Sequence, residues 1–119
     1  MAYIPKFTDE AIEDIKRLPK NVKNTLRNEI EKVICENPYN CAEELAGLLR
    51  EFRSYHYEDY RIIYKPYEDL KAIAIVGIGK KNSDHYAEIY KQLEQMAGAG
   101  KLADSFLRNL RSVAPQKAP

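Results

Sequence analysis

The side chain in this chain whose position most clearly suggests a chemical role is that of Arg61, because it interrupts a run that is otherwise suited to burial. The run reads Tyr-Arg-Ile-Ile-Tyr from Tyr60 to Tyr64, and aromatic and β-branched residues of this kind favour a pleated, half-buried strand. A guanidinium stays ionised, so at such a position it needs a partner or a function. Pairing with a carboxylate such as Glu51 or Glu58 is the simpler interpretation, and a functional role is the alternative.

More polar chemistry follows the next apolar run. Lys80 and Lys81 leave that run together, and a double lysine beside the strand arginine is where an anionic ligand would bind, although such a pair is usually a solvated loop. His85 and Tyr86 come directly afterwards, at the start of a segment with helical periodicity. Tyr86 and Tyr90 are four residues apart, which also suits the buried face of a helix.

Composition limits the class of protein. A chain of 119 residues suits a single domain with one core, and no apolar run approaches membrane-spanning length. The first seven residues do not resemble a signal peptide, so we expect a cytoplasmic protein. Cys35 and Cys41 are expected to be reduced thiols, with no metal site and no cofactor.

Charge is unevenly distributed along the chain. The net charge is +1, whereas residues 101–119 carry four basic groups and one acidic group, a net charge of +3, which leaves −2 for the first hundred residues. A protein that grips phosphates mainly by its overall charge would be more basic. Any nucleic-acid binding must therefore depend on a local cluster.

The elements that position these groups are predicted from the spacing of apolar residues and from residues that cap or break helices and strands. Residues 2–7 predict a strand at a sheet edge, because Pro5 cannot donate a backbone hydrogen bond. Two helices follow, the first capped by Thr8 or Asp9 and ended by Pro19, the second capped by Asn21. Their one-sided apolar stripes must lie on a flat partner.

That partner is predicted from residues 43–79. It begins with a hairpin whose strands meet at a turn at Glu58 and Asp59, continues through a turn at 66–70, and ends in a central strand at 71–79. Gly77 or Gly79 is expected to mark a bulge or the end of that strand. Ser83 or Asp84 can cap the next helix.

The predicted fold class is α+β, a small twisted and mainly antiparallel sheet with the N-terminal helical hairpin packed on one face. We expect the domain to span residues 1–97. Residues 98–119 would form a hinge at 98–100 and a C-terminal amphipathic helix, whose apolar face carries Leu102, Phe106, Leu110 and Val113. This helix could fold back on the body, pair with a copy of itself, or dock on another protein.

Three segments together resemble the RelE/ParE superfamily, the toxins of type II toxin-antitoxin systems. Residues 45–48 read Leu-Ala-Gly-Leu, residues 59–64 read Asp-Tyr-Arg-Ile-Ile-Tyr, and residues 73–81 form an apolar strand that ends in glycine and lysines. The middle segment is the most specific of the three. The resemblance implies a RelE-like fold over roughly residues 2–97.

In the RelE and YoeB-like branch, the resemblance implies ribosome-dependent cleavage of messenger RNA, by attack of a 2′-hydroxyl on the adjacent phosphate and without metal. Arg61 and Lys81 would stabilise the phosphate, His85 would act as the acid, and Glu43 would be the general base. Tyr86 would stack on a base or orient the phosphate. The expected RNA contacts are Lys80, Arg53, Arg50 and His56.

The implied partners are a cognate antitoxin protein and the ribosome with its messenger, with no membrane. A homodimer or a toxin-antitoxin hetero-oligomer is possible on the same grounds. Two alternatives stay open. A ParE-like protein would inhibit DNA gyrase without catalysing a reaction, and a family member that has lost toxicity would serve as an interaction module.

Overall fold

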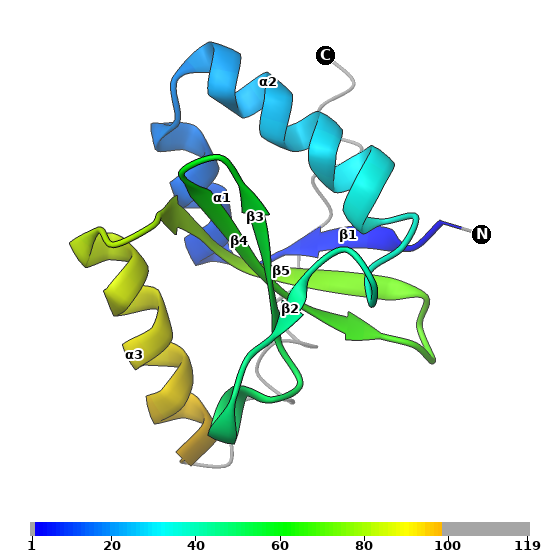
Figure 1. The fold of residues 1–119 in the computed structure, drawn as a ribbon, viewed down its shortest axis with the longest axis vertical. Coiled ribbons are helices and arrows are strands. Elements are labelled where there is room, and N and C mark those ends of the chain that lie inside the picture. The colour runs from blue at the N-terminus through cyan, green and yellow to red at the C-terminus, as the bar shows by residue number, and fades with distance from the viewer. Residues whose placement is uncertain (1, 99–119) are drawn as a thin grey trace.

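The structure, a computed structural model, describes residues 2–98 and contains a five-stranded mixed sheet flanked by helices (Figure 1). The strand order is β1-β5-β4-β3-β2, with β1 parallel to β5 and every other neighbouring pair antiparallel. The predicted α+β class with a mainly antiparallel sheet is confirmed. The elements are β1 (Ile4–Phe7), α1 (Asp9–Arg17), α2 (Lys20–Glu29), the π-helical turn η1 (Ile30–Ile34), β2 (Glu43–Glu44), the 3-10 turn η2 (Gly47–Leu49), β3 (Arg53–Tyr57), β4 (Tyr60–Tyr67), β5 (Ala72–Lys80) and α3 (Asp84–Gly98).

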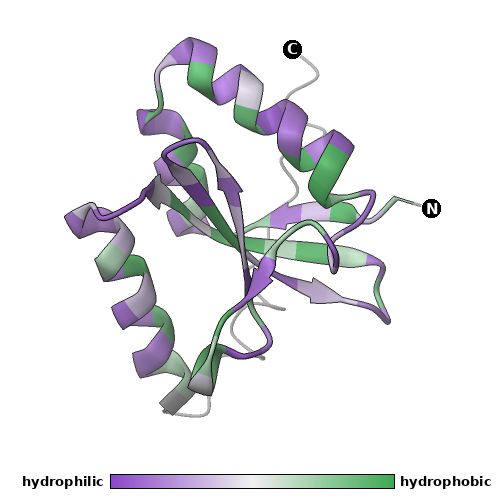
Figure 2. Ribbon diagram, in the orientation of Figure 1, coloured by the Kyte–Doolittle hydropathy of each residue, from purple (hydrophilic) through white to green (hydrophobic). Residues whose placement is uncertain are grey.

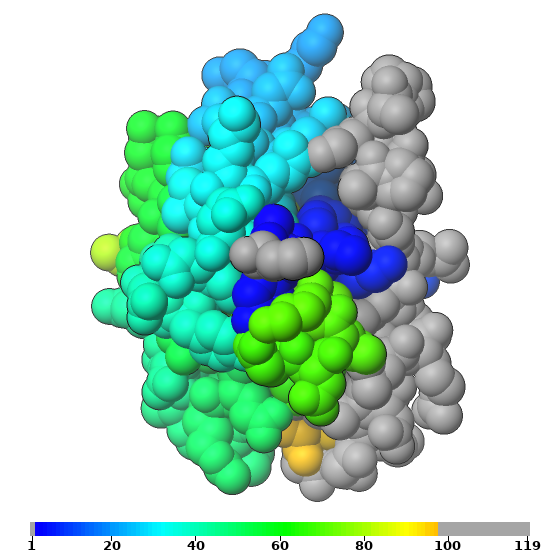
Figure 3. All heavy atoms as spheres, turned by 90° about the vertical axis from the view of Figure 1, so that its right-hand side faces the viewer, coloured from blue at the N-terminus to red at the C-terminus, as the bar shows by residue number. Residues whose placement is uncertain are grey.

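The predicted edge strand and the first helix are confirmed. β1 lies at the sheet edge, and Figure 3 shows it in dark blue between the end of the helical hairpin and the turn that joins β4 to β5. Tyr3 N donates to Cys35 O at 2.8 Å, and Ile4 N donates to Lys71 O at 2.9 Å. These bonds hold the start of β1 to the end of the helical hairpin and to the start of β5. Thr8 caps α1, since its Oγ1 accepts from Ala11 N at 3.1 Å.

The predicted cap of the second helix is wrong. α2 begins at Lys20 with Pro19 at the N-cap and no side-chain cap hydrogen bond, so Asn21 lies inside the first turn. The helix therefore begins two residues earlier than an Asn21 cap would place it, directly after Pro19, whose fixed φ and missing N–H are compatible with a helix start. α1 and α2 cover one face of the sheet, where the larger core is built from Phe7, Ala11, Leu26, Ile30, Ile34, Cys35, Ile62, Tyr64, Ile73, Ile75 and Ile78.

The predicted turn between Tyr57 and Tyr60 is confirmed, while the boundaries of the strands around it differ from expectation. The strand expected to start near Glu43 is divided into β2 and β3 by η2, where Gly47 has a φ of +65° and thus a backbone conformation that favours glycine. β4 continues through Pro66 and Tyr67 instead of turning at 66. β3 pairs with β4 only as far as Tyr64, so at Pro66 the strand has a hydrogen-bonded neighbour on one side only, β5. A proline is tolerated at such an edge position because it has no N–H to donate.

α3 covers the opposite face of the sheet, which gives the protein a second, smaller core. This core contains Leu49, Phe52, Ile63, Val76, Ile89 and Leu93. Figure 2 shows hydrophobic residues concentrated in the central strands and on the inward sides of the helices. The expected irregularity lies beside Gly77, because β4 and β5 shift register between Ile63 and Tyr64, opposite Gly77 and Ile75.

No helix within residues 2–98 is long and apolar enough to cross a membrane. Gly98, the first residue of the hinge predicted at 98–100, is still the last residue of α3. The rest of that hinge and the predicted C-terminal helix lie outside the described residues.

Candidate functional site

The pleat of the sheet places Arg61 on the face that α3 covers. Arg61 pairs directly with His56 on β3 and with Gly79 on β5, and residues that face each other across a ladder point to the same side. Neighbouring Ile62 belongs to the core under α1 and α2, as alternation requires. Ser54, two residues before His56, therefore shares the face of Arg61.

Arg61 is nearly buried, with 8% of its surface exposed. Its Nη1 donates to the carbonyl oxygens of Glu58 at 2.8 Å and Tyr60 at 2.9 Å. Among the described residues, no carboxylate lies within ion-pair distance of Arg61, so the structural interpretation that paired it with Glu51 or Glu58 is wrong. The Nε and Nη2 donors have no partner within residues 2–98. A fixed guanidinium with unused donors suits an oxyanion such as a phosphate.

Glu43 reaches this face through the short strand β2. Glu43 pairs with Ser54 in the β2–β3 ladder, and its Oε1 lies 3.5 Å from Nε2 of His56. Both side chains are accessible, at 78% for Glu43 and 44% for His56. A carboxylate and an imidazole therefore stand together, with the imidazole directly across from Arg61.

Arg53 fixes the strand that carries Glu43. Its Nη1 donates to the carbonyl oxygens of Tyr39 at 2.7 Å and Ala42 at 3.3 Å, and its Nη2 donates to Oε2 of Glu44 at 3.1 Å. The guanidinium also stacks over the Tyr39 ring, 5.2 Å from its centroid. Arg53 was expected to contact RNA, but the structure employs it to hold the loop before β2.

Tyr86 closes the site from α3. Its hydroxyl lies 3.5 Å from Oγ of Ser54 and 3.0 Å from the hydroxyl of Tyr90, and the two tyrosine rings meet edge to face. Burial, followed by the hydrogen bond with Tyr86, raises the pKa of Tyr90, and the charge of Glu43 adds to the rise. Both phenols thus lie at the site and in the adjoining core. Together, six residues form what we call the Arg61 face: Glu43, Ser54, His56, Arg61, Tyr86 and Tyr90.

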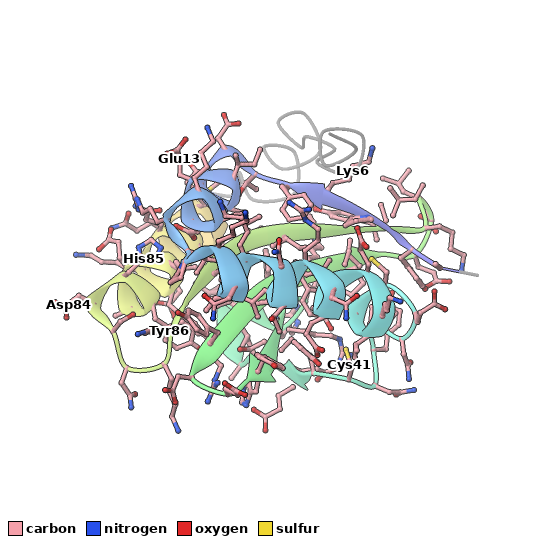
Figure 4. The ribbon with its side chains drawn as sticks, turned by 90° about the horizontal axis from the view of Figure 1, so that it is seen from above. Lys6, Glu13, Cys41, Asp84, His85 and Tyr86 are labelled. Atoms are coloured by element: carbon pink, nitrogen blue, oxygen red, sulfur yellow. The ribbon has the colours of Figure 1, made fainter. Side chains whose placement is uncertain are left out.

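His85 is directed away from the Arg61 face, contrary to expectation. Its Nε2 lies 2.6 Å from Oδ1 of Asp14, a carboxylate on α1 that also accepts from Ile78 N at 2.9 Å. Figure 4 shows His85 directed toward α1, while the adjacent Tyr86 lies on the other side, toward the hairpin. Burial raises the pKa of Asp14, although the Ile78 hydrogen bond, His85 and Arg17 each oppose the rise.

Of the other basic residues predicted to belong to the site, one lies near Arg61 and two lie elsewhere. Lys81 N donates to Asp59 O at 2.7 Å, at the turn whose Glu58 carbonyl holds Arg61, so these two cations are anchored at the same end of the sheet. Lys80 stacks over the Tyr60 ring at 5.8 Å, on the opposite face. Arg50 is exposed at the end of η2, outside the sheet.

The structure thus brings Glu43, Arg61 and Tyr86 together with His56, places Lys81 nearby, and leaves His85 outside this group. Ser54 and Tyr90 were not predicted to belong to the site. The period-two spacing of Ser54 and His56 was the available signal, because it places both on one face of a strand. Within residues 2–98, no three histidine, cysteine or acidic side chains are grouped as metal ligands.

The comparisons with known proteins agree in fold and family. The family model described as ParE toxin of type II toxin-antitoxin system, parDE, matches residues 6–85. The mRNA interferase toxin RelE of Escherichia coli (strain K12) is 24% identical over 95 residues, which make up 78% of this chain and 99% of that relative.

Two solved structures show the same fold. A chain of the toxin-antitoxin complex RelBE2 from Mycobacterium tuberculosis superposes with a TM-score of 0.66 at 18% identity, over 70% of this chain and 95% of that one. The isolated E. coli RelE toxin superposes with a TM-score of 0.59 at 23% identity, over 76% and 98%.

Proposed function

Since the chain belongs to the family of ParE toxins of type II toxin-antitoxin systems, it is the toxin component of such a system, and we propose that it cleaves messenger RNA on the ribosome. The E. coli relative is named as an mRNA interferase, which supports an endoribonuclease activity. The observation that carries the proposal is the convergence of Glu43, His56 and Arg61 on one face. Transesterification of RNA needs a proton acceptor, a proton donor and a cation at the phosphate.

In the proposed reaction, the Glu43 carboxylate accepts the proton of the 2′-hydroxyl as the 2′-oxygen bonds to phosphorus. The Arg61 guanidinium, with Lys81 nearby, stabilises the charge on the phosphoryl oxygens. The bond from phosphorus to the 5′-oxygen breaks, and the protonated imidazole of His56 donates its proton to that oxygen. The products are a 2′,3′-cyclic phosphate and a free 5′-hydroxyl, and every proton is accounted for.

Tyr86 is proposed to position the substrate. Tyr86 lies in the first turn of α3, close to Gly79, where an added Cβ would lie 3.4 Å from both Cα of Tyr86 and Cδ2 of His85, so the glycine lets the helix start lie close to the sheet. An aromatic ring beside a phosphate site can stack on an unpaired base of single-stranded RNA.

The partners proposed for this toxin are the ribosome with its messenger and a cognate antitoxin. The structure from M. tuberculosis is that of a toxin-antitoxin complex, which supports an antitoxin partner for a chain of the same fold. An antitoxin would neutralise the toxin by covering the Arg61 face, by blocking entry to it, or by displacing the last helix.

The decisive experiment is primer extension on a defined messenger incubated with purified ribosomes. Cleavage should require ribosomes and should be lost in Arg61→Ala, whereas Arg17→Ala removes an equal charge from α1 and should cleave normally. His56→Gln and His85→Gln form a second matched pair. Loss of cleavage in the first alone supports the assigned acid, and loss in the second alone would restore the sequence-based assignment.

The second candidate function is inhibition of DNA gyrase without catalysis. It is favoured by the family model that matches the chain, which is that of ParE, and by the near-neutral net charge. A supercoiling assay with purified gyrase distinguishes the two functions. Inhibition of supercoiling, combined with no ribosome-dependent cleavage, would replace the endoribonuclease proposal.

A further inference from the structure

A groove of about 390 Å³ lies between α1 and α3, separate from the Arg61 face. Val76, Ile89, Leu93 and Met96 give it an apolar floor. The same α3 that presents Tyr86 to the Arg61 face therefore presents a second, apolar side to this groove. None of the six residues of the Arg61 face lines it.

The rim of the groove is strongly acidic. One arginine, Arg17, lines it together with five carboxylates: Asp9, Glu10, Glu13, Asp14 and Glu88. The net charge of the lining is −4 with His85 neutral. Asp14 is already engaged with His85, but Glu13 is solvent-accessible, at 57%, and among residues 2–98 its ion-pair partner is the exposed Lys16 alone. An occupant of this groove must be apolar on one side and basic at its edges, which excludes nucleic acid.

The chain itself contains a segment with this chemistry, immediately after α3. Residues 99–119 carry a net charge of +3, and Leu102, Phe106, Leu110 and Val113 recur at helical spacing. We propose that residues 101–113 dock as an amphipathic helix in the groove between α1 and α3, with the apolar face on the floor and basic side chains at the acidic rim. Of the three fates left open by the sequence, the structure thus favours folding back on the body.

Reach and length agree with this arrangement. Met96 lines the groove and lies only two residues before the end of α3, so the segment starts at one end of the site it would fill. The lining residues of α3 run from His85 to Met96, about 17 Å along the helix axis at 1.5 Å per residue. A helix over residues 101–113 is about 20 Å long by the same measure.

Gly98, the last residue of α3, and Gly100 beyond it would allow the reversal of direction that such docking needs, because glycine adopts backbone conformations closed to other residues. Docked in this way, the segment would pack against the flank of α3 opposite Tyr86. It would steady the helix that completes the Arg61 face without covering that face. The inference does not depend on whether the toxin cleaves RNA.

Limited trypsin digestion of the full chain tests the proposal, because Arg108 and Arg111 are cleavage sites within the segment. We expect cleavage after these arginines to be at least tenfold slower than in a synthetic peptide of residues 99–119, since a docked helix must open before a protease can bind. Mass spectrometry identifies each cleaved bond, and digestion at low and high protein concentration distinguishes docking within one chain from docking on a second copy.

A variant pair isolates the groove. Glu13→Gln with Glu88→Gln should raise the cleavage rate by up to about fivefold for each ion pair lost, because exposed pairs contribute little individually. Glu36→Gln with Asp69→Asn removes two exposed carboxylates outside the groove and should leave the rate unchanged.

Three results would overturn the proposal. Equal cleavage rates in the full chain and the peptide would show that the segment is not docked. Protection that appears only at high concentration would show that the occupant is a second copy. Protection that is insensitive to the groove variant but lost at high salt would place the segment on another acidic surface.

Discussion

The close contact between β5 and α3 makes a sharp prediction about Gly77. A methyl group added at this position would lie 2.8 Å from both Cδ1 and Cγ2 of Ile89 and 3.1 Å from its Cγ1. Real Cβ atoms do not approach other carbon atoms so closely, so either the strand or the helix must move. Ile89 is only 7% exposed and sits in the smaller core, so its side chain has little room to adjust.

The expected cost of Gly77→Ala follows from overpacking. Forcing an extra methyl group into a packed core typically costs about 1–3 kcal/mol. Alanine also restricts the unfolded chain more than glycine does, which offsets the cost by about 0.4–1 kcal/mol. Gly79→Ala is a matched control, since its methyl group would meet its nearest neighbours at 3.4 Å, an ordinary contact on the same face of the same strand.

Urea unfolding of the two variants measures the difference directly. We expect Gly77→Ala to be less stable than Gly79→Ala by about 1–3 kcal/mol, or roughly 4 °C or more in Tm for a domain of this size. Combining Gly77→Ala with Ile89→Ala should cost less than the sum of the two single changes, because the new methyl group occupies space that the isoleucine vacates. Equal stabilities for the two glycine variants, or strict additivity in the double variant, would refute the packing argument.

Two further predictions concern side chains around the site. Because burial raises the pKa of Asp14 in the folded protein, its contribution to stability is present at low pH and lost as pH rises through that pKa. Urea unfolding from pH 3.5 upward should therefore show wild type losing stability relative to Asp14→Asn, and a difference that is independent of pH would contradict this. Arg53→Ala should cost about 1–3 kcal/mol, because it leaves the carbonyls of Tyr39 and Ala42 without their donor. It should also reduce activity by releasing the strand that holds Glu43, and full activity in a destabilised variant would show that this strand needs no such anchor.

Much of the fold was predictable because the responsible patterns are local. Thr8 was one of two predicted caps, and the turn after Tyr57 followed from the two polar residues between two apolar runs. Boundaries failed where a longer-range condition decided them. Pro66 stays in β4 because the β3–β4 pairing ends at Tyr64. The residues next to Pro66 in the sequence do not show where that pairing ends.

The site was predictable in part, and the reason differs between residues. Alternation along a strand placed Arg61 on one face of the sheet, so its position could be anticipated. The choice between His56 and His85 could not, because it depends on Asp14, which lies 71 residues before His85 and on another helix. Glu43 reached the group through a two-residue strand too short to leave a pattern.

The sequence by itself thus determined the order of the helices and the longer strands, the apolar faces of the helices, and a strand arginine that needed a partner or a function. Each of these rests on spacings of two to four residues, which local backbone geometry converts into faces. Only the tertiary structure decided that β5 inserts between β1 and β4, that Arg61 binds carbonyls and no carboxylate, and that His85 turns toward α1. These outcomes depend on contacts between residues distant in the chain. Such contacts form only when the whole core is packed, so the neighbouring sequence cannot decide them.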